Sequence, residues 1–154
     1  MHLAQINIGR IRAPLEDPIM EGFVSNLDEI NALAERTPGF VWRLVGDGNN
    51  ATSIRPFDDP TMLLNMSVWE SLEALRGYVY RSEHARFVRA RLEWFEKLEG
   101  PVYALWWIPV GHIPTVQEGI ERLDYLRANG PTDRAFWFPR PSPRPEGRND
   151  LREP

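Results

Sequence analysis

The chain has 154 residues, a formal net charge of −4 and no cysteine. That length suits one domain with its own core, and the missing cysteine excludes disulfides, thiolate metal sites and cysteine nucleophiles. A mildly acidic chain without a basic stripe does not fit nucleic acid as a partner. The first residues carry no secretory pattern and no apolar run reaches membrane-spanning length, so we expect a cytoplasmic protein that binds no membrane.

The first half of the chain alternates between strand and helix patterns. Residues 2–8 alternate apolar and polar side chains, which predicts a strand. After a proline-containing break, residues 19–36 repeat apolar side chains at helical spacing, which predicts an amphipathic helix. A second strand is expected over 39–45, followed by a glycine- and asparagine-rich turn and a candidate return strand at 51–55.

The second half continues this order. Residues 62–69 alternate as a strand does, and residues 70–98 predict a second long helix, broken near 77–82. Residues 101–109 carry almost no polar atoms, which is typical of a strand buried on both faces.

The C-terminal part contains one more helix and a tail. Thr115 and Glu118 have capping-box spacing, so a last helix is expected from Thr115, with a short edge strand over 135–138. Residues 139–154 are proline-rich and nearly free of apolar side chains, which predicts an extended or disordered tail after a single domain over 1–138. A role of the tail as a proline-motif ligand stays open.

The order of these elements predicts the fold. Strand, helix, strand, strand, helix, strand is the order of a ferredoxin-like α+β domain, an antiparallel sheet with both helices on one face; the last helix is an addition. The other face would carry residues such as Trp106 or Trp107, and monomers rarely expose a large apolar patch. We therefore predict a homodimer whose two sheets pack face to face into a dimeric α+β barrel.

Two polar residues fall within the apolar stripe of the second long helix. At about 100° per residue, His84 and Arg91 share a side with Phe87 and Trp94, whereas the other charged residues of this segment lie opposite. A buried polar group needs a partner, and His84 is a candidate for titration near neutral pH. Two interpretations stay open: a core histidine and arginine satisfied by neighbours, or the polar end of a cavity.

A second polar set lies on the predicted strands. Each of these side chains occupies a strand face whose opposite face is apolar: Gln5, Asn7, Arg43, Asn65 and Ser67. If the strand register brings these faces together, they form one polar patch among aromatic residues, as small-molecule sites do. The aromatic candidates are Trp69, Tyr80, Tyr103, Trp106 and Trp107. The alternative is a dimer interface or a water-exposed surface.

Other chemistries lack their motifs. The histidines at positions 2, 84 and 112 lack metal-ligand spacing, so no metal is expected. The sequence also lacks a glycine-rich nucleotide motif that opens a helix and a serine nucleophile elbow. For His112, just before the last helix, a structural capping role is favoured over a place at a pocket mouth.

Several stretches resemble DUF3291, a bacterial family of domains of unknown function. They are Leu3–Asn7, Gly39–Leu44, Asn65–Glu70, Tyr80–His84 with Trp94–Phe95, and Leu105–Thr115. The resemblance spans about residues 2–138 and implies a dimeric α+β barrel but no established activity.

A weaker similarity joins Trp69–Leu75 to the strand-to-helix junction of antibiotic-biosynthesis-type monooxygenases. It implies roles for Asn65, Trp69, His84 and Arg91 around a barrel cavity. The spacing from Trp69 to His84 is longer than this group's haem-ligating histidine requires, so haem is not expected.

These observations predict a small-molecule enzyme for an aromatic or polyketide-like substrate, either a cofactor-independent monooxygenase-like or an isomerase-like enzyme. The catalytic candidates are His84 as general acid or base, Arg91 and Asn65. The substrate-binding candidates are Asn7, Arg43, Trp69, Tyr80, Trp107 and His112. The alternative is a non-catalytic ligand-binding or structural homodimer. No cofactor is expected.

Overall fold

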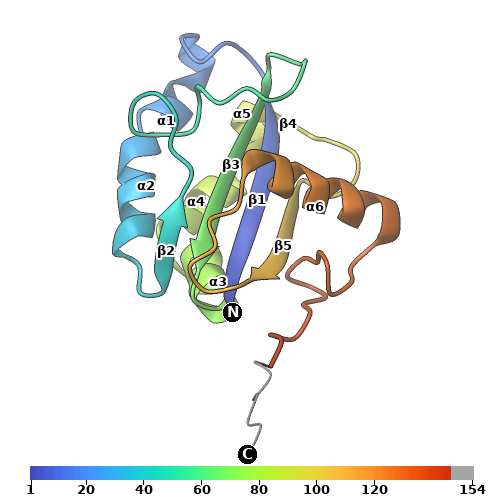
Figure 1. Ribbon diagram of the computed structural model, residues 1–154. Coiled ribbons are helices and arrows are strands. Elements are labelled where there is room, and N and C mark those ends of the chain that lie inside the picture. Colours follow the sequence, from blue (N-terminus) through green and yellow to red (C-terminus); the bar gives the residue numbers. More distant parts are fainter. Residues whose placement is uncertain (147–154) are drawn as a thin grey trace, which may run out of the picture.

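The computed structural model describes residues 1–146 and shows an antiparallel sheet with helices on both faces (Figure 1). The elements are β1 (His2–Ile11), the 3-10 helix η1 (Pro18–Met20), α1 (Glu21–Val24), α2 (Leu27–Arg36), β2 (Phe40–Arg43), β3 (Met62–Trp69), α3 (Leu72–Arg81), α4 (His84–Arg89), α5 (Arg91–Trp94), β4 (Phe95–Glu96), β5 (Tyr103–Ile108) and α6 (Val116–Asn129).

The sheet has the predicted ferredoxin-like order. β2 pairs with β3 and β3 with β1, while the other edge of β1 pairs with β5 and, further along, with β4. β1 runs to Ile11 rather than ending at residue 8, because Arg10 and Ile11 pair with β4. Gly9 permits this close fit, since a Cβ there would lie 2.5 Å from the Phe95 ring. The α+β class is confirmed.

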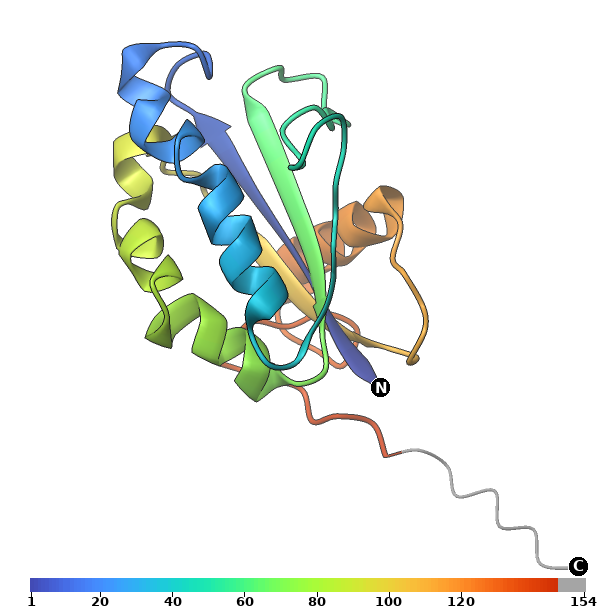
Figure 2. The same ribbon diagram turned by 90° about the vertical axis from the view of Figure 1, so that its left-hand side faces the viewer.

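The helices form two separate layers. Helices α1 to α5 cover one face of the sheet and α6 crosses the other (Figures 1 and 2). The α6 face packs Leu123 and Leu126 with Ile6 and Met66 of the sheet. Gly119 lets α6 approach closely, because a Cβ there would lie 2.9 Å from Met66 Cε and 3.0 Å from Ile6 Cδ1.

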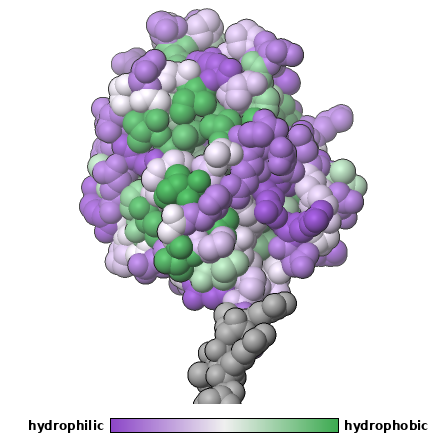
Figure 3. All heavy atoms as spheres, in the orientation of Figure 1, coloured by the Kyte–Doolittle hydropathy of each residue, from purple (hydrophilic) through white to green (hydrophobic). Residues whose placement is uncertain are grey.

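This second layer corrects one sequence-based argument. The predicted homodimer rested on a bare second sheet face, but α6 covers part of it and Trp106 there is fully buried. Apolar side chains remain visible beside α6 (Figure 3), and in the loop before α6, Val110 and Ile113 are exposed. The homodimer stays a prediction, which now rests on these remaining apolar side chains.

Both predicted long helices are interrupted. The first breaks at Ser25 and Asn26, where the Asn26 side-chain Nδ2 donates to the Gly22 carbonyl oxygen at 2.8 Å. The second breaks at Ser82, whose hydroxyl donates to the Tyr78 carbonyl and accepts from the His84 amide. It ends at Trp94 rather than residue 98, because the next two residues form β4. The candidate return strand at 51–55 is a turn.

The C-terminal region agrees with the sequence-based prediction at the α6 cap and differs from it at residues 135–138. The Thr115 side chain caps α6 by accepting from the Glu118 amide at 3.1 Å, as its spacing predicts. In place of an edge strand, Phe136 forms an isolated bridge with Leu105. Residues 139–146 run on along the surface, and the rest of the predicted tail, 147–154, lies outside the described residues. The domain boundary at residue 138 stays a prediction.

No helix in the described part of the chain is both long and apolar enough to span a bilayer.

Candidate small-molecule site

The strand register places the predicted polar side chains on one face of the sheet. Asn7 lies opposite Asn65, and Gln5 lies opposite Ser67. On the other side of β3, Arg43 also lies opposite Ser67. Directly opposed residues of antiparallel strands point to the same face. All five therefore share the face that α1 to α5 cover, which we call the polar sheet face.

Hydrogen bonds connect the centre of the polar sheet face. Gln5 Nε2 and Trp69 Nε1 both donate to Ser67 Oγ at 2.8 Å, and Asn7 Nδ2 donates to Gln5 Oε1 at 3.1 Å. Gln5 and Ser67 are 7% and 6% exposed. Buried polar groups need such partners, so the network fixes the orientation of the Gln5 and Asn7 amides.

Asn65 differs from its neighbours on this face. Leu63 and Ser67, two residues away on either side along β3, are buried, but Asn65 is exposed. The helices therefore leave an opening over this position. Its side-chain amide has no hydrogen-bond partner among the described residues, so its donor and acceptor can meet a small molecule.

Three rings stack beside the network. Tyr78 of α3 lies between Trp69 and His84, with ring centroids 5.1 Å from Trp69 and 4.6 Å from His84. The Tyr78 hydroxyl donates to the Ile30 carbonyl oxygen at 3.2 Å, which ties α3 to α2. Burial raises the pKa of the Tyr78 phenol, and the Arg43 charge lowers it by less. Tyr78 is therefore a neutral wall of the site.

His84 is the titratable group at the end of this stack. Its Nδ1 is buried and has no partner among the described residues. Burial lowers the pKa of His84, and the Val79 backbone opposes this shift by less. The imidazole is therefore neutral near pH 7, the form in which it accepts a proton.

Arg91 points inward but is already engaged. Its Nη2 donates to the Ile8 carbonyl oxygen at 3.2 Å, between the end of the β5 pairing at Asn7 and the start of the β4 pairing at Arg10. Burial lowers the pKa of this guanidinium. The predicted sorting of charge holds, since Arg86 and Glu93 are exposed. His84 and Arg91 stand on separate short helices, however, and not on one continuous helix.

Arg43 is bound by the protein in a similar way. Its side chain is 8% exposed and donates to Glu35 Oε1 at 2.7 Å. It also donates to the Asn49 backbone oxygen and to Asn49 Oδ1, at 2.8 and 2.9 Å. Arg43 thus joins β2 to α2 and to the following turn.

The remaining candidates lie elsewhere. Tyr80 is exposed and packs edge-on against Phe138, 5.3 Å away. Trp107 lies opposite Leu3 at the far end of the sheet, where its Nε1 donates to the Ser142 backbone oxygen. His112 lies in the loop before α6 and pairs with Glu118 at 2.7 Å, which fits its structural interpretation. In the described part of the chain, none of these three bonds to the polar network or stacks on Tyr78 or His84.

Three residues of this site were not among the predicted site residues: Gln5 and Ser67 were grouped only with the polar strand set, and Tyr78 was missed. Ser67 and Gln5 carry the buried network, and their alternation along the strands was the signal. Tyr78 falls in the segment where a helix break was expected; its spacing of three from the buried Leu75 indicates that both face inward. Across the described residues, no group of three or more acidic or histidine side chains could hold a metal ion.

Together, the sheet order, the helix layer and the internal polar network define an α+β domain of ferredoxin-like type with a candidate ligand site beneath its helices. The chain belongs to DUF3291, the family described as domain of unknown function, whose model matches residues 2–152. No curated protein matches the sequence.

Solved structures resemble this chain at low sequence identity. SnoaB, a cofactor-independent oxygenase from Streptomyces nogalater, is 18% identical and superposes with a TM-score of 0.50 over 70% of this chain and 93% of its own. The ActVA-Orf6 monooxygenase of Streptomyces coelicolor, solved with Nanaomycin D, is 17% identical, with a TM-score of 0.42 over 74% of this chain and 92% of its own. At 18% identity the likeness to SnoaB concerns the fold alone.

Proposed function

We propose that the protein is a small-molecule enzyme whose substrate enters over Asn65 and reaches the polar sheet face. The observation that carries this proposal is the exposure of Asn65 in the middle of a strand whose neighbouring side chains on that face are buried. A mid-strand amide that is open to solvent beside a fixed polar network is suited to orient a ligand. The substrate class is an enolisable aromatic ketone or phenol.

The roles of the residues follow from their surroundings. The Asn65 amide donates to a ketone oxygen and stabilises the negative charge that develops there on enolisation. His84 accepts the proton from carbon, because burial keeps its imidazole neutral. Trp69 is fully buried and its Nε1 is bound to Ser67, so it supports the site and does not stack on the substrate.

With dioxygen as co-reactant, this chemistry needs no bound cofactor. The enolate transfers electrons to dioxygen, and a carbon–oxygen bond forms. The resulting peroxide then takes up the proton held by His84 and becomes a carbon-bound hydroperoxide. Loss of water then converts a methylene group and one dioxygen molecule into a carbonyl group and one water molecule. The fold that the chain shares with a cofactor-independent oxygenase supports this choice of reaction over simple isomerisation.

A second candidate function is a non-catalytic ligand-binding or structural homodimer. It is favoured by the state of the two arginines, because Arg43 and Arg91 already bond to protein groups. Neither guanidinium is then free to hold a substrate. Under both functions the homodimer is proposed from the apolar side chains beside α6, and its test is the molar mass by sedimentation equilibrium.

Dioxygen uptake with anthrone separates the two functions. Anthrone is an enolisable aromatic ketone that would give anthraquinone and water. We expect the wild-type chain to consume dioxygen. His84→Ala and Asn65→Ala should each lose about 100-fold in rate, the lower end for a positioned proton-transfer group and for a donor to a developing oxyanion. Glu83→Gln is the matched control, since this exposed neighbour of His84 lies outside the site. Uptake no faster than that of anthrone alone would reject the oxygenase, and unchanged uptake in His84→Ala would reject the assigned base.

A further inference from the structure

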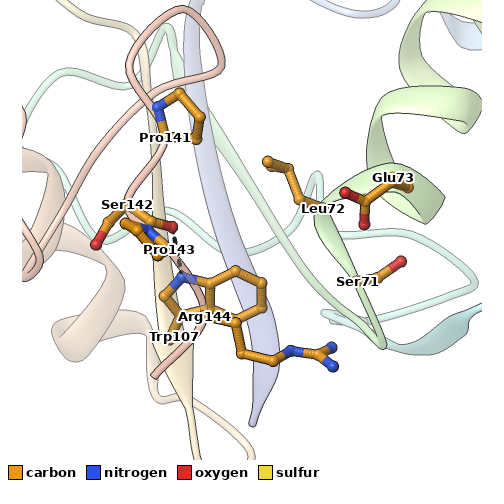
Figure 4. A pocket seen from close by; sticks show the side chains of 8 residues that line it. All are labelled: Ser71, Leu72, Glu73, Trp107, Pro141, Ser142, Pro143 and Arg144. Carbon is orange, nitrogen blue, oxygen red and sulfur yellow. Dashed lines mark hydrogen bonds between the residues drawn. The ribbon is translucent and has the colours of Figure 1, made fainter. Parts of the chain in front are cut away.

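The C-terminal proline-rich segment lies against a groove that the proposed function does not use. Pro141, Ser142, Pro143 and Arg144 line a pocket of about 390 Å³ with Trp107 and the first residues of α3 (Figure 4). Figure 4 shows the segment and Trp107 on one side of the hollow and Ser71, Leu72 and Glu73 on the other. We call the surface formed by Trp107 and residues 71–73, without the segment, the Trp107 groove.

The sequence of the segment sets its backbone. Proline stands at every second position from 139 to 145, which fixes those φ angles near −65° and removes their amide donors. The segment has no helix or strand over 141–146. Such a chain favours the polyproline II conformation, which leaves its carbonyl oxygens outward and free to accept hydrogen bonds.

The contacts of the segment match the way aromatic grooves bind polyproline II chains. Trp107 Nε1 donates to the Ser142 backbone oxygen at 3.0 Å. The Arg144 guanidinium lies over the Trp107 ring, 5.3 Å from its centroid, and also donates to the Glu70 carbonyl oxygen. An indole N–H that binds a carbonyl between two prolines, with a flanking arginine, is a known type of peptide recognition.

The segment is anchored firmly at one end and weakly at the other. Phe136 is fully buried and bridges to Leu105, and Arg76 donates to the Phe138 carbonyl oxygen at 3.3 Å. Beyond that anchor, Pro141, Pro143 and Arg144 are exposed. A few exposed contacts of this kind can open while the anchor holds the segment close to its groove.

From this we infer that the Trp107 groove is a polyproline II recognition site whose Trp107 side is occupied by the chain's own residues 141–144. The partner it fits is an exposed Pro-Ser-Pro-Arg-like segment of another polypeptide, which competes with the internal segment. The inference is independent of the proposed enzyme activity, because Trp107 lies at the far end of the sheet from Asn65.

The test follows the Trp107 indole N–H by nuclear magnetic resonance in the full-length chain. The indole signal is assigned from its loss in Trp107→Phe. We expect P141G/P143G/R144A to exchange this proton at least about tenfold faster than the wild type, equivalent to about 1.4 kcal/mol of docking free energy. Arg144→Ala alone is a second, milder variant. Arg140→Ala is the matched control, because this exposed residue contributes only its backbone amide to the hydrogen bonds described here.

Addition of a peptide then tests recognition in trans. A synthetic peptide of residues 139–146 should shift the Trp107 indole signal of P141G/P143G/R144A saturably. We expect saturation at about millimolar peptide, because a short tether holds the internal segment at an effective concentration of about that size. The same peptide with glycine in place of every proline should not. Equal exchange rates in the wild type, P141G/P143G/R144A and Arg144→Ala would overturn the docking of residues 141–144 on Trp107. No saturable shift, or an equal shift with the glycine peptide, would overturn polyproline recognition.

Discussion

Asn7 and Asn65 lie directly opposite each other on β1 and β3, yet within residues 1–146 only the Asn7 side-chain amide is held by a protein group. Asn7 donates to Gln5 in the buried network, whereas Asn65 is exposed and has no side-chain partner among the described residues. The same residue type therefore has two roles across one pair of strands: one amide belongs to the internal structure, and the other faces the opening.

Exposed and buried polar groups of the polar sheet face predict effects of different size on stability. Asn65→Ala should change the free energy of unfolding by less than about 0.5 kcal/mol, as exposed substitutions do. Ser67→Ala should lower it by about 1–3 kcal/mol, because two buried donors, Gln5 Nε2 and Trp69 Nε1, lose their acceptor. Urea unfolding followed by circular dichroism measures both. A large loss of stability in Asn65→Ala would show that Asn65 is structural.

The buried imidazole predicts a pH dependence of stability. Burial lowers the pKa of His84 below its ordinary value of 6.5, so the unfolded chain binds a proton at higher pH than the folded one. The contribution of His84 is full above about pH 6.5 and is lost as the pH falls toward the folded-state pKa. We expect the wild type to lose more stability than His84→Gln between about pH 7.5 and pH 5.5.

Comparison with this variant isolates His84 from other titrating groups. The pKa values of Asp59 and Glu118 are lowered by their own hydrogen-bond partners, and these groups remain in both chains. Urea unfolding across the pH series gives the difference directly. A difference that does not depend on pH would mean that His84 titrates alike in the folded and unfolded chains.

The close contact of α6 with the sheet predicts a strong effect at Gly119. Gly119→Val would place methyl groups against Met66 and Ile6, which already lie within 3.0 Å of a Cβ position. We expect a loss of about 1–3 kcal/mol in the free energy of unfolding from overpacking. If chemical denaturation shows Gly119→Val to be as stable as the wild type, α6 does not pack on Ile6 and Met66 as described.

Gly77 predicts a change of the opposite sign. It lies inside α3, and a Cβ there would meet no atom within 4 Å. Alanine restricts the unfolded chain and favours the helix by about 0.5–1 kcal/mol over glycine. Gly77→Ala should therefore raise the thermal unfolding midpoint, measured by differential scanning calorimetry. A lower midpoint would indicate that the break after α3 depends on this glycine.

Alternation and capping patterns predicted much of the fold. The predicted bounds of β3 agree with the structure at both ends, and Thr115 caps α6 as its spacing indicates. The break in the second long helix was predicted near 77–82 and falls at Ser82. The break in the first was missed, because the apolar stripe continues through Asn26 while its side chain takes a backbone hydrogen bond. The covering of the second face by α6 also depends on tertiary packing at Gly119, which no local pattern reveals.

The candidate site was predictable in part. Strand alternation placed Asn7 and Asn65 on one face because register and face follow from a period of two. The same pattern could not show that Arg43 and Arg91 bind protein carbonyl and carboxylate groups, since Glu35 and Ile8 reach them only in the folded chain. The action of the predicted site residues on a substrate stays a prediction.

The position of β1 has a consequence for how the chain matures. Its three ladder partners β3, β4 and β5, and the helix that covers Ile6, all follow this strand in the chain. Contacts between such distant segments close slowly. A nascent polypeptide emerging from the ribosome thus carries a central strand with one open edge until β5 and α6 have followed, which makes early capture by chaperones an expected stage of its biosynthesis.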